Sequence, residues 1–314
     1  MVDRSTPPKM GPAATSQTES IVGFSGLGRV FLTYGRMIKF SHTIFALPFA
    51  LAAVVLAQRH HPIIASDIFW VLLAMVAARS AAMGFNRITD SRIDGLNPRT
   101  RSREIPAGQI STAQAMVFVI FSAATFLLAA WMLGRLCFYL ALPMLAVLFA
   151  YSYTQRFTWL SHLFLGFAIS LAPVGAWVAM TKGMAPEIWL LSAALMTYIA
   201  GFDILYACQD VQFDRGAGLY SIPARFGVRR ALQIARLIHM VCLGAFVSLY
   251  FAFDMNGAYL AAVVVIAILL IIEHRLVNPE DLSRINVAFF HVNSVISCTL
   301  FLGIVADELV RRLM

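Results

Sequence analysis

The chain has 314 residues, of which 60% are hydrophobic and only 13% are charged, and its mean hydropathy is +0.77. Soluble domains are usually about half apolar and about a quarter charged, so this chain has more apolar surface than a soluble core can bury. The composition excludes a soluble globular protein and predicts an integral membrane protein. The net charge of +8 then indicates orientation in the bilayer rather than nucleic-acid binding.

Residues 1–28 are polar, with Pro, Gly, Ser and Thr throughout, and we predict a disordered cytoplasmic tail. Residues 29–314 form a transmembrane domain in this prediction. Because a bilayer core of about 30 Å requires roughly 20 apolar residues per helix, about nine transmembrane helices are expected. They fall at about 30–57, 63–85, 112–133, 136–153, 159–181, 186–208, 231–252, 257–273 and 285–306. Two are short, which leaves eight as the alternative. The predicted fold class is all-α, a polytopic membrane protein.

Lys and Arg side chains accumulate in the cytoplasmic loops of membrane proteins. Here they concentrate in the N-terminal segment and in two long connections, near 86–111 and 209–230. We therefore expect a multi-pass protein of the inner (cytoplasmic) membrane with a cytoplasmic N-terminus. The connections on the other side are short. Because elaborated loops usually carry function, we expect the chemistry on the cytoplasmic face.

Acidic residues recur at four-residue steps where the second and sixth predicted helices end. The two motifs are Asn86, Asp90 and Asp94, and Tyr206, Asp210 and Asp214, with Asp203 three residues before Tyr206. This spacing places side chains on one face of a helix, where like charges destabilise it. A divalent cation would remove the repulsion, and one or two carboxylates completed by phosphate and water oxygens describe a Mg²⁺ site. The alternative is that these aspartates lie at solvated helix ends and balance the charge of nearby arginines.

The segments after the two motifs favour the metal interpretation. The first holds Arg99, Arg101 and Arg103 in a loop broken by Pro and Gly, and guanidinium groups suit phosphate oxygens. The second holds Gly216 and Gly218, which let the backbone approach a ligand closely. Together with a membrane, these features predict a ligand with a diphosphate head and a lipid tail, such as a polyprenyl diphosphate.

These residues resemble the motifs of the UbiA superfamily of intramembrane aromatic prenyltransferases, and the resemblance extends from about residue 29 to near the end of the chain. The family's Arg-Thr-x-x-Arg and Tyr-Ala-x-x-Asp-x-x-x-Asp elements match Arg99–Arg103 and Tyr206–Asp214, and Ser221–Gly227 follows the second. Two positions depart from the pattern. Many members have an acidic residue at the place of Arg87 and a proline at the place of Glu104.

The resemblance implies about nine helices around a central cavity under a cytoplasmic cap, in two pseudo-repeats at about 29–155 and 156–280 plus a last helix. It also implies Mg²⁺-dependent transfer of a prenyl chain to a ring carbon of an aromatic acid. Within the family, residues 38–48 and 206–210 resemble the 4-hydroxybenzoate polyprenyltransferases of quinone biosynthesis. The alternatives are 1,4-dihydroxy-6-naphthoate as the acceptor, as in menaquinone biosynthesis, a haem or chlorophyll prenyltransferase and, from another class, a transporter.

The family's mechanism gives each motif residue a hypothetical role. Mg²⁺ is held by Asn86, Asp90, Asp94, Asp210 and Asp214. The diphosphate is neutralised by Arg99 and Arg103, joined by Arg225, and the acceptor is oriented or deprotonated by Asp203 or Tyr206. The acceptor's carboxylate requires a cation, for which the candidates are Lys39 and Arg36. Arg79 lies inside the second predicted helix, where a charge must find a partner or extend to the interface.

Overall fold

The computed structural model describes residues 26–314 apart from 60, 63 and 283. Within these residues the chain is helical and has no β-strand. Eight helical segments are long and apolar enough to cross a membrane, which confirms the predicted all-α polytopic membrane fold. Their helices are α3 (Ala65–Leu96), α4 (Thr112–Leu133), α5 (Arg135–Thr154), α6 (Ser161–Thr181), α7 (Ile188–Ala207), α10 (Val228–Ala252), α11 (Gly257–Leu276) and α12 (Asn293–Leu313). The short π-helical segment η3 (Val287–Val292) leads into α12.

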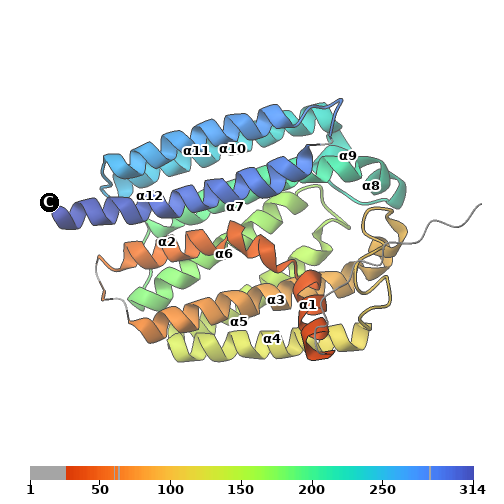
Figure 1. Ribbon diagram of the computed structural model, residues 1–314, viewed down its shortest axis with the longest axis horizontal. Coiled ribbons are helices and arrows are strands. Elements are labelled where there is room, and N and C mark those ends of the chain that lie inside the picture. Colours follow the sequence, from red (N-terminus) through yellow and green to blue (C-terminus); the bar gives the residue numbers. More distant parts are fainter. Residues whose placement is uncertain (1–25, 60, 63, 283) are drawn as a thin grey trace, which may run out of the picture.

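The continuous first helix predicted at 30–57 is wrong. The chain forms α1 (Gly26–Met37), the 3₁₀ segment η1 (Phe40–Phe45) and α2 (Leu47–Ala57), and α1 lies across the bundle while α2 runs along it (Figure 1). Lys39 adopts a left-handed backbone conformation with φ 47°, which breaks the helix before η1. At the usual rises, η1 and α2 together extend about 28 Å, close to a bilayer core. The predicted first crossing is therefore in two pieces, and α2 alone is shorter than the eight segments above, so a ninth crossing stays a prediction.

The predicted tail, 1–28, lies outside the described residues except for 26–28, which belong to α1. The division into two pseudo-repeats stays a prediction. On the outside of the bundle large apolar side chains are exposed, as at Phe121 on α4 (71%) and Phe251 on α10 (75%). Such a surface suits contact with lipid rather than water.

The helix α3 continues past the predicted end at 85 and therefore carries the whole first acidic motif on helical backbone. Gly84, just before that motif, lets α4 approach closely, because a Cβ atom there would lie 2.8 Å from the Val119 side chain. On the other side of the bundle, a Cβ at Gly201 of α7 would lie 2.2 Å from the His239 ring of α10. Small residues allow helices in membranes to pack this closely.

The second acidic motif is less regular than its spacing suggests. α7 ends at Ala207, a 3₁₀ turn η2 (Cys208–Asp210) follows, and α8 (Val211–Ala217) carries Asp214. α9 (Ile222–Phe226) then begins where Ser221 caps it, accepting the Ala224 N–H at 3.2 Å. These short helices and the loop after α3 lie at the same end of the bundle, which confirms the predicted cap (Figure 1).

Candidate active site

Two adjoining cavities lie inside the bundle. The first is polar and lies under the cap, where it is lined by both acidic motifs and the loop after α3. The second is apolar and extends away from the cap, with Ala78, Phe126, Leu133, Cys137, Ala141 and Val178 among its lining residues. Arg79, Met83 and Tyr151 line both, so they mark the junction between the cavities. A ligand with a charged head and an apolar tail matches this arrangement.

The carboxylates of the first motif are held by arginines from two different loops. Asp90 accepts hydrogen bonds from Asn86 Nδ2 and Arg156 Nη2, both at 2.8 Å. Asp94 accepts Arg103 Nη1 on both of its oxygens, at 2.6 and 2.7 Å. Arg103 was predicted at this site, whereas Arg156, in the connection between α5 and α6, was not.

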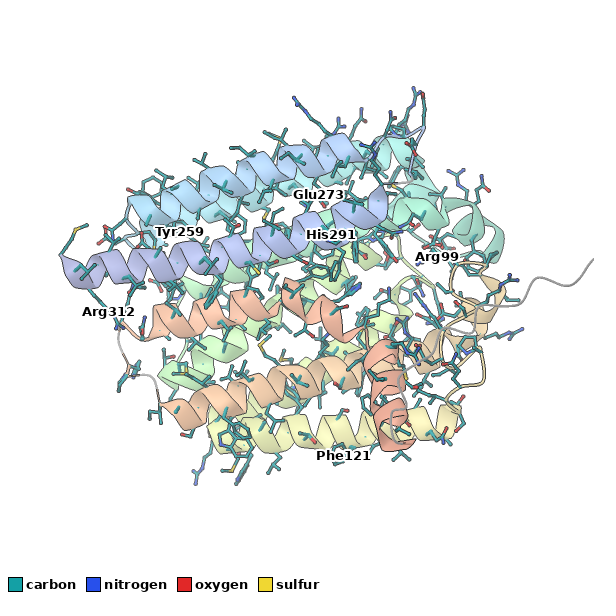
Figure 2. The ribbon with its side chains drawn as sticks, viewed as in Figure 1. Arg99, Phe121, Tyr259, Glu273, His291 and Arg312 are labelled. Atoms are coloured by element: carbon teal, nitrogen blue, oxygen red, sulfur yellow. The ribbon has the colours of Figure 1, made fainter. Side chains whose placement is uncertain are left out.

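The second motif is bound to the first loop. Arg99 donates from Nε to Asp210 Oδ1 at 2.9 Å, and from Nη1 to the Tyr206 hydroxyl at 3.0 Å. Asp214 accepts the Ser221 hydroxyl at 2.8 Å. Figure 2 places Arg99 at the cap end, opposite to Arg312 at the end of α12. The structure thus brings all five predicted metal ligands and Arg99, Arg103, Asp203 and Tyr206 to one cavity.

The ligand set fits a metal ion that arrives with a phosphate. In the described part of the chain, no group of three His, Cys, Asp or Glu side chains is close enough to form a metal cage. Mg²⁺ needs no such cage, because one or two carboxylates and substrate phosphates suffice. Three of the four carboxylates, those of Asp90, Asp94 and Asp210, are bound by guanidinium groups, which are themselves phosphate ligands. When a metal ion and a diphosphate bind, the carboxylates would bind the metal and the guanidinium groups would bind the phosphate oxygens.

Three cations of this cavity, Lys39, Arg79 and Arg87, form no ion pair with the carboxylates that the structure describes. Arg79 donates from Nη2 to the Lys39 carbonyl at 3.2 Å, and its buried Nε has no hydrogen-bond partner among the described residues. Burial, reinforced by Arg87, Arg103 and other nearby arginines, lowers the pKa of Lys39 to about 8. The inner part of the cavity is therefore electropositive and suited to an anion.

Arg36 and Arg225, both predicted to bind a substrate, are not among the residues that line the cavity. Arg36 is exposed on α1, where its Nη2 donates to the Thr33 hydroxyl at 3.4 Å. The break at Lys39 separates it from the residues that line the cavity. Arg225 is exposed on α9 with its guanidinium carbon 5.8 Å from the centre of the Trp159 ring. Arg79, which was not predicted at the site, lies in the cavity lining instead.

Asp203 has a partner that sequence reasoning missed. His162, at the start of α6, places Nδ1 2.7 Å from Asp203 Oδ2, and both residues line the polar cavity. Beside them the Tyr206 ring packs on Phe289 at 4.2 Å, with Lys39 Nζ 5.9 Å from its centre. The sequence signals for Arg79 and His162 were weak, namely a charged or titratable residue within a predicted span.

Acidic and basic side chains under a cap, open to an apolar cavity within a helical membrane bundle, are the arrangement expected of an intramembrane site for a lipid-tailed, anionic ligand. The family model described as the UbiA prenyltransferase family matches residues 46–295, and the chain belongs to this family. It is a multi-pass membrane prenyltransferase, as predicted. The transporter alternative is not supported.

Known proteins agree with this membership. The apo structure of a UbiA homolog from Aeropyrum pernix K1 has a TM-score of 0.78 at 30% identity and covers 85% of this chain and 98% of its own. A UbiA homolog from Archaeoglobus fulgidus, solved bound to GPP and Mg²⁺, has a TM-score of 0.69 at 18% identity, over 87% of this chain and 99% of its own. A 4-hydroxybenzoate octaprenyltransferase from Nitrosospira multiformis is 29% identical over 76% of this chain and 82% of its own.

Proposed function

We propose that this enzyme transfers the chain of a polyprenyl diphosphate to a ring carbon of 4-hydroxybenzoate, with Mg²⁺, at the inner membrane and from its cytoplasmic face. The observation that carries the proposal is the order of charges along the joined cavities. Two arginine-bound acidic motifs lie under the cap, unpaired cations follow, and an apolar cavity begins at Arg79. The relatives named for 4-hydroxybenzoate support this acceptor, and the basic loops at the cap end support the orientation.

The diphosphate head is bound under the cap. Asp90, Asp94, Asp210 and Asp214, with Asn86, would hold Mg²⁺, which supplies positive charge to the leaving diphosphate when bound. Arg99 and Arg103 turn from their carboxylates to phosphate oxygens. The allylic C–O bond then breaks with its electron pair on the diphosphate, whose developing charge these guanidinium groups stabilise.

The acceptor is bound deeper in the polar cavity. Its carboxylate meets Arg79 and Lys39, two of the three cavity cations that form no ion pair with the described carboxylates. The ring carbon ortho to the hydroxyl donates its π electrons to the allylic cation, and a C–C bond forms. The proton on that carbon then leaves to Asp203, which restores the aromatic ring. Tyr206, bound to Arg99, lies between the two substrates' groups and orients them.

The prenyl tail occupies the apolar cavity, where it is removed from water without polar contacts. The lining is rich in alanine, with Ala74, Ala78, Ala82, Ala141, Ala168 and Ala172 leaving room for a branched chain. The product is amphiphilic and leaves into the surrounding lipid.

The test is prenyl transfer by membranes that contain the protein. They are incubated with Mg²⁺, a radiolabelled polyprenyl diphosphate and, separately, 4-hydroxybenzoate or 1,4-dihydroxy-6-naphthoate, and label is counted in the prenylated acceptor. We expect product with 4-hydroxybenzoate that disappears with EDTA. Product only with the naphthoate would replace the acceptor and keep the chemistry, and no product with either, from folded protein, would contradict the proposal.

A further inference from the structure

His162 is buried, with 4% of its surface exposed, and both of its ring nitrogens are engaged. Nε2 lies 3.3 Å from the backbone nitrogen of Ile222, and Nδ1 lies 2.7 Å from Asp203 Oδ2. A backbone N–H can only donate, so Nε2 must be the acceptor. In the neutral ring the proton is then on Nδ1, which donates to the Asp203 carboxylate. The surroundings of His162 therefore select one tautomer.

This bond fixes how Asp203 faces the cavity. With Oδ2 occupied by His162, Oδ1 has no hydrogen-bond partner within the described residues. The Asp203 side chain is 24% exposed and lines the polar cavity beside Tyr206. Oδ1 is thus the oxygen available to an acceptor, and rotation of the carboxylate would break a short hydrogen bond.

The same bonds connect Asp203 to the second acidic motif. Asp214 accepts the hydroxyl of Ser221 at 2.8 Å, and the next residue, Ile222, donates its N–H to His162. A continuous path therefore runs from Asp214 through residues 221–222 and His162 to Asp203. The start of α9 contacts the part of the cavity assigned to diphosphate and the part assigned to the acceptor.

We propose that His162 is a positioning residue that holds Asp203 Oδ1 toward the aromatic acceptor, in register with the segment that holds Asp214. Both of its ring nitrogens are bound within the protein, so it acts through Asp203. The inference rests on the proposed function and adds a residue to it. The competing explanation is that His162 only packs α6 against α7 and α9, and kinetics separates the two.

Two substitutions test the two hydrogen bonds of the His162 ring separately. In His162→Asn the amide nitrogen takes the place of Nδ1 and retains the donor to Asp203. In His162→Gln the amide oxygen takes the place of Nε2, which keeps the Ile222 bond and removes that donor. Removal of one such bond changes kcat/KM by about tenfold. We expect that loss in kcat/KM for the acceptor with His162→Gln, a change under about threefold with His162→Asn, and an unchanged KM for the prenyl diphosphate in both.

The control is His61→Gln, because His61 is exposed between α2 and α3. α2 ends and α3 begins at the end of the bundle opposite the cap (Figure 1). All rates are normalised to folded protein from size-exclusion chromatography. A double-mutant cycle with Asp203→Asn adds an independent readout, since His162→Gln should cost little once the carboxylate is gone. Equal losses in the Asn and Gln variants, or additive losses in the cycle, would show a merely structural His162 and overturn the inference.

Nitrogen-15 NMR of histidine-labelled wild-type protein tests the geometry without relying on a variant's folding, with the His162→Asn spectrum used to assign the signal. We expect the Nδ1–H tautomer, and an Nε2–H tautomer would contradict the proposal. Failure of the proposed function looks different. In that case the wild-type protein itself would form no prenylated acceptor, whereas failure of this inference leaves wild-type activity in place.

Discussion

Arg99 donates two hydrogen bonds to Asp210, from Nε to Oδ1 at 2.9 Å and from Nη2 to Oδ2 at 2.5 Å. These bonds connect the loop after α3 to the second acidic motif. Both residues are assigned to the diphosphate, one as its ligand and one as a ligand of its metal. We therefore expect the pair to open when the diphosphate binds.

Replacement of Arg99 should weaken diphosphate binding while the acceptor site stays intact. A charged hydrogen bond contributes about 1.5–3 kcal/mol, so Arg99→Gln should raise the KM for the prenyl diphosphate by about ten- to a hundredfold. Arg99→Lys keeps the charge but cannot donate two parallel hydrogen bonds, so its KM for the prenyl diphosphate should lie between those of wild type and Arg99→Gln. Steady-state kinetics with each substrate varied in turn makes the measurement. An increase confined to the acceptor's KM would contradict this assignment.

Arg79 should select the acceptor's carboxylate. Arg79→Gln is expected to raise the KM for the aromatic acid by about ten- to a hundredfold, with a change of under about threefold for the prenyl diphosphate. Arg36→Gln is the matched control, because Arg36 is exposed and does not line the cavity. A phenol without the carboxylate should react more slowly than the aromatic acid with wild-type protein, but not with Arg79→Gln. Equal discrimination by both proteins would show that Arg79 does not bind the carboxylate.

Lys39 gives the acceptor site a pH dependence. Burial and the nearby arginines lower its pKa from 10.5 to about 8, so the side chain loses its charge as the pH rises through about 8. The profile of kcat/KM reports groups of the free enzyme, so kcat/KM for the acceptor should fall above that pH. Lys39→Arg stays charged and should move the fall to higher pH. Division of one profile by the other removes the ionisation of the acceptor itself. Parallel profiles for the two proteins would exclude Lys39 from the carboxylate site.

The same shift has a consequence for stability. Because the pKa of Lys39 is lower in the folded protein than in the unfolded chain, the unfolded chain binds more protons between about pH 8 and 10.5. The contribution of Lys39 to the free energy of unfolding therefore rises with pH across this window. The sign is opposite to the effect on acceptor binding, so loss of activity there does not report unfolding.

The apolar cavity should set the length of the prenyl chain. Ala141 is buried (2% exposed) in its lining, toward the end remote from the cap. Ala141→Phe should lower kcat/KM for long polyprenyl diphosphates relative to short ones by about tenfold or more, since one misplaced methylene already costs about 1–3 kcal/mol. Ala124→Phe, at an exposed position of α4, is the control. Competition between chains of two lengths measures the ratio directly, and an unchanged ratio would place the tail elsewhere.

The regular parts of this molecule were the predictable ones. α3 carries Asn86, Asp90 and Asp94 on uninterrupted helix, so four-residue spacing was enough to place them together. The break at Lys39 could not be seen, because a non-glycine residue with positive φ leaves no signal in composition or hydropathy. Because of this break, Lys39 lines the cavity and Arg36 does not.

The sequence also could not predict which side chains on different helices bind each other. Asp90 is bound by Arg156, 66 positions away, and Asp203 by His162, 41 positions away. A charged residue inside a predicted span, such as Arg79, indicates a function or a burial problem, but its neighbours depend on how the helices pack. Motif spacing therefore predicted which acidic residues lie together, whereas the partners Arg156, Arg79 and His162 required the fold.

The central claim is that both acidic motifs act on one diphosphate in a metal-dependent transfer. The most direct measurement follows diphosphate release and prenylated product together with purified protein, for wild type, Asp90→Asn and Asp210→Asn, with and without EDTA. The account predicts equal amounts of the two products from wild type, none with EDTA, and a loss of at least about a hundredfold in each variant, since removal of one charge-stabilising group typically costs that much. Near wild-type transfer by either folded variant, or transfer that persists in EDTA, would contradict it.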